Sequence, residues 1–321
     1  MKSVAVVIAV MVTACSMVLA GGFDPVVYAI PHQLSLVQGQ STAELGRGGA
    51  GVAIQEDWSG NPASLPDTTK AAIQNQFYSF GSGLDMNLTA LKLAYPTGRW
   101  CFVVNVGELT SNSANLATLG GMKFNVHESD LTVQMNYRVS DRFKVGAAVA
   151  PQMNVELAIS SPGFKIDLHS KPSAGFRLGG IWDLSDGWSV GGFYDNYLER
   201  VSWGSGPYPW GTTSFRSEVG HYGIAKTTGK WTFAADRIKG RLVSGESAGS
   251  HLETWMLGSD YRSGNWTFRT GSFYGHPTAG AAFTSSRWTF NYAFADDVNS
   301  DELTPLLGGS STHAITASCS W

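Results

Sequence analysis

The chain has 321 residues, of which 15% are charged and 12% aromatic, with 38 glycines and a net charge of −3 at pH 7. This charge balance gives no basic surface for nucleic acid, so a nucleic-acid partner is not expected. Soluble domains carry about 25% charged residues. The low charge content therefore argues against an ordinary globular enzyme and favours a barrel whose outer face meets membrane lipid and whose interior is polar.

The first 20 residues are interpreted as a signal peptide. Lys2 supplies a positive start, residues 4–12 form an apolar core, and a small-residue cleavage site ends at Ala20. The apolar run is too short to span a membrane as a helix. We expect cleavage after Ala20. The competing interpretation is a lipoprotein signal in which Cys15 becomes the lipidated first residue, and both interpretations predict export.

The next segment, residues 21–68, is rich in glycine and shows no sustained strand alternation. Its G-x-G-G-A-G run is not a phosphate-binding loop, because no Lys-Ser/Thr pair closes it and Pro62 and Pro66 follow. Glycine and alanine allow a backbone to pack closely and to adopt positive φ. Asn61 before Pro62 is biased towards an extended, rigid corner. We expect this segment to fold back into the barrel as a plug, or hatch.

A repeated tight turn followed by an aromatic residue and an apolar alternation predicts the strands of residues 69–321. Gly, Asp, Asn and Ser at such turns are typical of β-hairpins. The six copies are PTGRWCFVV (96–104), SDRFKVGAA (140–148), SDGWSVGGF (185–193), TGKWTFAAD (228–236), SGNWTFRTG (263–271) and SSRWTFNYA (285–293). These turns join twelve strands, and one strand on each side (71–80 and 313–321) gives fourteen. We therefore predict an all-β fold, a transmembrane antiparallel β-barrel of about 14 strands with an N-terminal hatch.

Longer, less regular segments alternate with the tight turns. Short periplasmic turns and long extracellular loops are the layout of an outer-membrane barrel, which places this chain in the outer membrane of a Gram-negative-type bacterium. The segments expected to be extracellular loops are 110–126, 154–170, 203–214, 240–250 and 296–311.

Aromatic residues gather near the tight turns, as Trp and Tyr do at the headgroup level of a membrane. This predicts an aromatic girdle at the periplasmic end. Its members are Tyr95, Trp100, Tyr137, Phe143, Trp182, Trp188, Trp231, Tyr261, Trp266, Trp288 and Trp321.

The last segment, residues 313–321, alternates cleanly and ends on Trp321. A terminal amphipathic strand with an aromatic end resembles the signal of bacterial outer-membrane barrels. The resemblance implies the barrel-assembly machinery and periplasmic chaperones as partners during biogenesis.

The residues ELGRGGAGVA (44–53), an acidic pair and Asn-Pro-Ala ahead of the first strand resemble the hatch of the FadL/TodX long-chain fatty-acid transporter family, including its shorter PorV/PorQ-like relatives. The resemblance implies an outer-membrane channel for small hydrophobic molecules. The alternative it implies is an accessory or scaffold barrel of a secretion or surface complex. The hatch residues expected from it are Gly46, Gly48, Gly49, Asp57, Asn61, Pro62 and Ala63.

Two further groups of residues are expected to act with the hatch. The aromatic residues Trp203, Tyr208 and Trp210 are candidates for ligand capture at the outer loops, or for packing over the barrel mouth. Inward-facing charges near the turns are expected either to tether Glu44, Glu56 or Asp57 or to line a wet lumen. These are Lys92, Arg138, Lys144, Arg177, Asp183 and Arg269.

Neither the histidines nor the cysteines suggest catalysis. The seven histidines are dispersed without metal-ligand spacing, and nothing pairs a nucleophile with a base. We therefore expect no enzyme activity, no metal and no cofactor. Cys101 and Cys319 lie in alternating strand patterns and are expected to act as small apolar side chains rather than to pair.

Overall fold

The computed structural model describes residues 41–56, 58–112, 114–116, 122–161, 164–171, 175–205, 208–244, 251–297 and 308–321. The signal peptide, the two candidate processing sites at Cys15 and Ala20, residues 21–40 of the predicted hatch, and Asp57 lie outside these ranges. No helix among the described residues is long and apolar enough to cross a bilayer.

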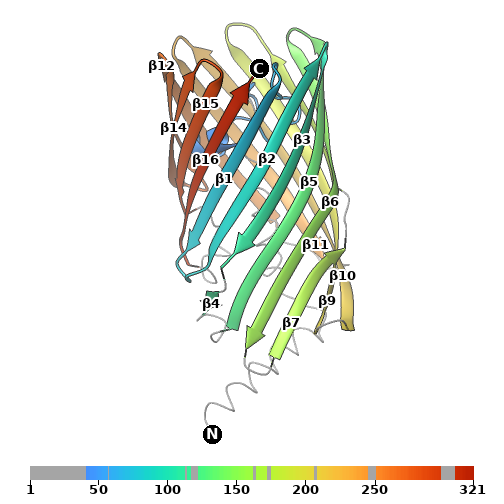
Figure 1. Ribbon diagram of the computed structural model, residues 1–321. Helices are drawn as coiled ribbons and strands as arrows, with labels where there is room; N and C mark the ends of the chain where they lie inside the picture. Colours follow the sequence, from blue (N-terminus) through green and yellow to red (C-terminus); the bar gives the residue numbers. More distant parts are fainter. Residues whose placement is uncertain are drawn as a thin grey trace.

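One antiparallel sheet makes up the wall of the molecule, and it closes on itself (Figure 1). The first strand pairs with the last from Lys70↔Ser320 to Phe80↔Ser310, which removes both edges. The strands are β1 (Lys70–Phe80), β2 (Asp85–Thr97), β3 (Trp100–Ser111), β4 (Ala114–Leu116), β5 (Met122–Ser140), β6 (Phe143–Ser161), β7 (Phe164–Lys171), β8 (Gly175–Asp183), β9 (Trp188–Ser205), β10 (Tyr208–Thr228), β11 (Trp231–Ser244), β12 (His251–Ser263), β13 (Trp266–Phe273), β14 (His276–Ser285), β15 (Trp288–Asp296) and β16 (Ser310–Ser320).

The predicted number of fourteen barrel strands is confirmed. The short β4 only flanks β5, and β7 and β8 share one position in the ring between β6 and β9. Their register with β6 is the same on both sides, whereas their register with β9 differs by one residue. The pairing with β9 is therefore offset by one residue between Lys171 of β7 and Gly175 of β8.

All six predicted tight turns are present at one end of the barrel, which we call the tight-turn end (Figure 1). Gly229 and Gly264 follow their strands with φ of 57° each, a conformation that favours glycine. The C-terminus lies at the same end, and the side chain of Trp321 is 62% exposed. Its backbone N–H donates to Thr69 O at 3.1 Å, which joins the last residue to the start of β1.

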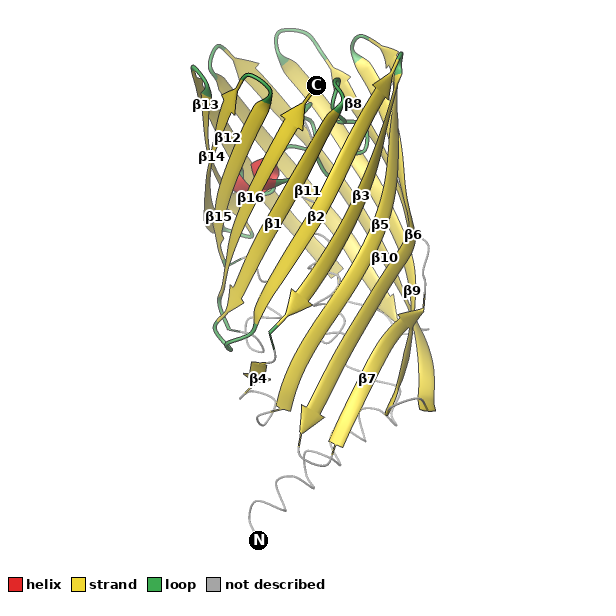
Figure 2. Ribbon diagram, in the orientation of Figure 1, coloured by secondary structure: helices red, strands yellow, loops and turns green. Residues whose placement is uncertain are grey.

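The opposite end, the long-strand end, differs from the prediction of irregular loops. Much of the predicted loop sequence is strand, so β5 and β6 have 19 residues and β10 has 21. Membrane strands need only ~9–11 residues, and these strands extend past the ends of shorter strands such as β1 and β15 (Figure 2). On the other side of the barrel β13 has 8 residues and turns back through Tyr274 and Gly275, a hairpin that the repeat did not predict. The rim is therefore high over β5–β10 and low over β13–β15.

The predicted alternation of faces is confirmed by burial. On β1, Gln74, Gln76 and Tyr78 are almost fully buried in the interior, whereas Ile73 is 50% exposed on the outside. The aromatic girdle also forms on the outer face, where Trp residues stand beside aromatic partners on the next strand. These pairs, with 4.6 to 4.9 Å between ring centroids, are Trp100–Tyr137, Trp231–Tyr261 and Trp266–Phe283.

Candidate functional site: the luminal segment

Residues 41–56 and 58–69, which we call the luminal segment, cross the inside of the barrel before β1 begins. The segment opens with the short helix α3 (Thr42–Gly46), which lies against β13–β16 (Figure 2). Ser41 caps this helix: its Oγ accepts from Glu44 N at 3.1 Å, and Ser41 N donates to Glu44 Oε2 at 2.8 Å. Thr42 Oγ1 lies 2.6 Å from Thr316 Oγ1 on β16. Local capping and one wall contact therefore fix the start of the segment.

Glu44 also joins the helix to the later part of the segment. Its carboxylate accepts from Ser59 Oγ at 2.6 Å and from Gly60 N at 3.1 Å. Burial, followed by repulsion from Glu56, raises the pKa of Glu44, while its hydrogen-bond donors oppose that shift. This side chain holds two turns of the segment together.

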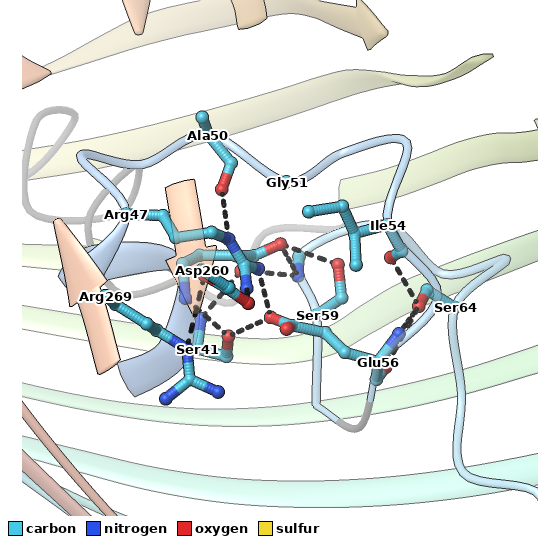
Figure 3. A network of polar contacts seen from close by, with 12 residues as sticks. Ser41, Arg47, Ala50, Gly51, Ile54, Glu56, Ser59, Ser64, Asp260 and Arg269 are labelled. Carbon is cyan, nitrogen blue, oxygen red and sulfur yellow. Dashed lines mark hydrogen bonds and ion pairs between the residues drawn. The ribbon is translucent and has the colours of Figure 1, made fainter. Parts of the chain in front are cut away.

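Arg47 is a charged centre between the segment and the wall (Figure 3). Its fully buried guanidinium contacts Glu56 Oε1 at 2.8 Å and Asp260 Oδ2 on β12 at 2.9 Å, and its Nε donates to Ala50 O at 3.1 Å. Burial opposes the charge, but the carboxylates of Glu56 and Asp260 outweigh it and raise the pKa of Arg47. The positive charge is thus held by one acid of the segment and one acid of the wall.

Asp236 on β11 forms a second anchor. Its Oδ2 accepts from the backbone N–H of Gly51 at 2.7 Å and of Val52 at 2.8 Å, and lies 3.0 Å from His221 Nε2. The carboxylate is fully buried. Two successive main-chain donors aimed at one carboxylate fix the path of the segment at this point.

The Asn61-Pro62-Ala63 corner is held by the opposite wall. Asn61 Nδ2 donates to Val52 O at 2.9 Å and to Gly180 O of β8 at 3.1 Å, and Asn61 Oδ1 accepts from Ala63 N at 3.0 Å. Arg177 of β8, paired with Asp195, donates to Gly60 O at 2.6 Å. The Asn61 side chain therefore shapes the turn and also binds the wall.

Glycines of the wall leave room for this corner, because they carry no side chain that would overlap it. A Cβ on Gly146 would overlap the carbonyl of Pro62, and a Cβ on Gly179 would overlap Asn61 Oδ1. Within the segment, Gly48 has a φ of 70° and lies so close to the backbone of Ser272 that a Cβ on it would overlap that backbone. The close approach of the two backbones depends on glycine from both sides.

An apolar cluster holds the end of the segment. Trp58 and Leu65 pack with Ala72, Ala94, Cys101 and Val103 on β1–β3. Cys101 is buried there, and neither it nor Cys319 is in a disulfide. The segment thus contacts the wall all around the barrel, and polar contacts dominate on the α3 and Gly51 sides.

The predicted hatch residues that the structure describes lie together in this segment, and all of them are buried. They are Gly46, Gly48, Gly49, Asn61, Pro62 and Ala63.

The predicted tethers are rearranged. Arg138 and Lys144 contact Asp67, at 2.8 and 3.3 Å, instead of the glutamates. Arg269 lies 3.7 Å from Asp260 on the neighbouring strand, and Glu56 is bound by Arg47 of the segment itself. Sequence reasoning missed Arg47, Asp236 and Asp260 as partners. Strand alternation could have marked the two aspartates as inward-facing, because each lies an odd number of residues from an outward aromatic residue.

The candidate capture residues do not lie in an irregular loop. Trp203 belongs to β9, and Tyr208 and Trp210 belong to β10, with the register shift of this hairpin between Pro209 and Gly211. Their side chains lie outside the described part of the structure, so ligand capture by them stays a prediction. Among the described residues, no group of three or more His, Cys, Asp or Glu side chains is arranged to hold a metal ion.

Comparison with known proteins identifies the fold. No protein-family model and no curated protein matches the sequence. The Ralstonia pickettii toluene transporter TbuX is similar in structure, with a TM-score of 0.60 and 14% identity over 88% of this chain and 98% of that one. The P. putida toluene transporter TodX gives 0.58 and 13%, and a Pseudomonas aeruginosa FadL homologue 0.56 and 13%, each over 88% of this chain and 98% of the other. At this identity the likeness establishes the fold that this chain shares with them.

Proposed function

We propose that this chain, with the fold of FadL/TodX-type hydrocarbon transporter barrels, is an outer-membrane channel that admits small hydrophobic molecules past a luminal hatch. The outer face supports the location, because it carries apolar side chains in the middle of the wall and aromatic residues at the tight-turn end. Leu91 and Leu178, for example, are 57% and 53% exposed on this face. Since short turns of such barrels face the periplasm, the long-strand end faces outwards from the cell.

The observation that carries the proposal is a change in lumen chemistry along the barrel axis. At the level of the luminal segment, inward positions carry polar anchors such as Asp236 and Asp260. On β10–β13 and around β1–β3, the side chains one or two inward positions further towards the long-strand end are apolar, whereas β5 and β16 keep the polar side chains of Glu128 and Thr312 there. Those on β10–β13 are Val219, Ile238, Met256 and Phe273, and those around β1–β3 are Tyr78, Phe80, Leu84, Met86, Leu88 and Leu109; all are buried. An apolar molecule entering from outside meets apolar side chains before it reaches the segment.

The bonding of the segment supports a role as a hatch. On the β11–β14 side its contacts are mainly hydrogen bonds and ion pairs, to Asp236, Asp260 and Thr278. Water can replace such bonds when a segment moves, so the net cost of releasing a hydrogen bond to a charged group is about 1.5–3 kcal/mol, well below its full strength. The apolar cluster around Trp58 and Leu65 has no such substitute and forms the fixed end. Transport would shift the Arg47–Val52 side of the segment and leave the residues near β1 in place.

The experiment is native mass spectrometry of the full chain extracted in mild detergent, followed by uptake of fatty acids and of monoaromatic hydrocarbons into proteoliposomes. We expect bound hydrophobic molecules and uptake above that of protein-free vesicles. A ligand-free protein that transports neither class would overturn the proposal.

A second function has one supporting observation, the high rim made by β5, β6, β9 and β10. Strands that project beyond a bilayer offer a surface for a protein partner, as an accessory or scaffold barrel of a secretion or surface complex requires. In that case the same mass spectrum would show a stoichiometric protein partner and no bound hydrophobic molecule.

A further inference from the structure

We infer that the outward face of β10–β12 near the long-strand end binds the phosphate groups of lipid headgroups in the outer leaflet. The inference goes beyond transport and depends only on the placement of the barrel in the membrane. The surface, which we call the basic strip, consists of Arg216, Arg237, Lys239 and Arg241, together with Glu218 and Glu253.

The side chains of the strip face away from the lumen. On β11, Asp236 and Ile238 are buried in the interior, and Asp236 bonds to the luminal segment. The alternate residues Arg237, Lys239 and Arg241 must therefore face outwards. In register, Arg241 pairs with Glu218 of β10, and Lys239 pairs with Glu253 of β12. The six residues thus form one surface across three neighbouring strands.

The strip begins where the apolar belt ends. On the outward face of β11, Trp231 and Phe233 are 44% and 48% exposed, and the charged residues follow from Arg237 towards the long-strand end. The guanidinium of Arg237 lies over the ring of Trp255, 5.4 Å from its centroid. Arginine stacked on an outward tryptophan is typical of the level where hydrocarbon gives way to headgroups. Arg241 lies ten residues beyond Trp231, a span that matches the ~9–11 residues of a membrane strand, and the long side chains of Arg237 and Lys239 can extend towards the same level. We therefore place the strip at the headgroup level of the leaflet at the long-strand end.

Its charge balance fits a phosphorylated headgroup. Four basic and two acidic side chains share the surface. Arg241 Nε contacts Glu218 Oε2 at 2.7 Å, and Arg237 pairs with Glu253. Among the described residues no ion pair is found for Arg216 or Lys239. Exposed ion pairs contribute little to stability. Arg237 and Arg241 can therefore direct some of their N–H donors to a phosphate, which guanidinium groups bind in bidentate fashion.

The outward faces of β2 and β3 carry acidic residues in place of basic ones beyond the apolar belt. On the outward faces of β2 and β3 the first charged residues beyond the belt are Asp85 and Glu108, and Glu108 contacts His127 of β5 at 3.1 Å. The basic strip is a local feature, and anionic headgroups are the partner that is present all along that level of the membrane.

The test compares two lipids on the intact, detergent-solubilised chain: the phosphorylated glycolipid of the outer leaflet, lipid A, and the same glycolipid after enzymatic removal of its phosphates. Retention is measured by native mass spectrometry and by titration at increasing salt. We expect preferential retention of the phosphorylated form, weakening with salt. Equal retention of both forms would overturn the inference, and this comparison requires no variant.

The variant arm is Arg216→Gln with Lys239→Gln, two strip residues outside the described ion pairs. We expect about thirtyfold weaker binding of the phosphorylated glycolipid. The matched control, Lys226→Gln with Lys230→Gln, removes two positive charges from the tight-turn end and should leave binding unchanged. Equal losses in the two double variants would contradict a local site. The last measurement adds inorganic phosphate to the lipid-bound protein. Displacement of the lipid by phosphate alone would indicate a site for free anions and would overturn the inference that the strip binds lipid.

Discussion

The guanidinium of Arg47 lies 2.9 Å from Asp260 Oδ2, although 213 residues separate the two in the chain. Both side chains are shielded from solvent, with exposed fractions of 0% and 4%. This pair links the luminal segment to β12 directly, and Glu56 completes the site from within the segment. This contact is separate from the backbone hydrogen bonds that join the wall strands. Changing it therefore tests the hatch proposal without altering the strand pairing.

Replacing Asp260 with Asn should loosen the luminal segment without unfolding the barrel. The substitution keeps the shape of the side chain but leaves Arg47 with one carboxylate fewer. Breaking a buried ion pair from one side costs about 3–5 kcal/mol, and this cost falls on the contact between segment and wall. We expect higher solute leak, measured as conductance in planar bilayers.

The control for this experiment is Glu108→Gln, because that carboxylate is 62% exposed on the outer face of β3. Its conductance should equal that of the unmodified chain. An unchanged conductance in the Asp260→Asn chain as well would contradict the hatch.

Replacing Asp236 with Ala should release the backbone of Gly51 and Val52. These two N–H groups lose their shared carboxylate acceptor, and hydrogen bonds to charged groups are worth about 1.5–3 kcal/mol. Since about 1.4 kcal/mol corresponds to a factor of ten, we expect amide exchange at these two residues to accelerate by about tenfold to a hundredfold. Hydrogen exchange read by mass spectrometry measures this, with Leu45 N, which bonds to Ser41 O within the segment, as the internal reference.

Adjacent glycines of β8 provide a matched pair of substitutions. A methyl group on Gly179 would overlap Asn61 Oδ1, whereas one on Gly180 would make ordinary contacts with Lys144 O at 3.7 Å and Phe143 Cε2 at 3.9 Å. We expect Gly179→Ala to displace the Asn-Pro-Ala corner and to lower the thermal stability of the folded chain. An overlap of this kind costs about 1–3 kcal/mol. Gly180→Ala should be close to neutral, and equal melting temperatures for the two variants would refute the close packing.

The way the N-terminus is processed distinguishes cleavage after Ala20 from a lipoprotein signal at Cys15. Cleavage after Ala20 predicts a mature chain that begins at Gly21 and carries no lipid. Intact mass measurement of the protein from isolated outer membranes reads both the cleavage site and any added acyl chains. A chain that begins at a lipidated Cys15 would establish the lipoprotein interpretation.

Replacing Asn61 with Ala tests the corner itself. The change removes the two donors to Val52 O and Gly180 O and the acceptor for Ala63 N. We expect leak in the same conductance assay, smaller than that of Asp260→Asn because no charge is left uncompensated. Permeability identical to that of the unmodified chain would count against a role of this corner in holding the segment.

The architecture of the wall was predictable from the sequence, because it depends on local signals. Side chains alternate between the two faces of a strand, so the apolar set of a membrane strand repeats every second residue, and turn residues with positive φ, such as Gly229 and Gly264, mark its ends. These signals were enough for fourteen strands, the outward girdle around Trp100 and Trp231, and a common end for the tight turns. The glycine-rich run and Asn61-Pro62 likewise marked a segment that packs closely and is not a strand.

Only the tertiary structure decided which residues meet across the lumen and how high each wall strand rises. The partners of Arg47 and of the Gly51 and Val52 amides come from β12 and β11, and strand alternation assigns a face to Asp260 and Asp236 but not a partner. Pairing requires the angular position of each strand around the closed ring and the path of the segment inside it. The same holds for the high rim, because the described residues within 154–170 and 203–214 form strand only when neighbouring strands complete their hydrogen bonds. The sequence determined what each position can do, and closure of the barrel determined the group that each position faces.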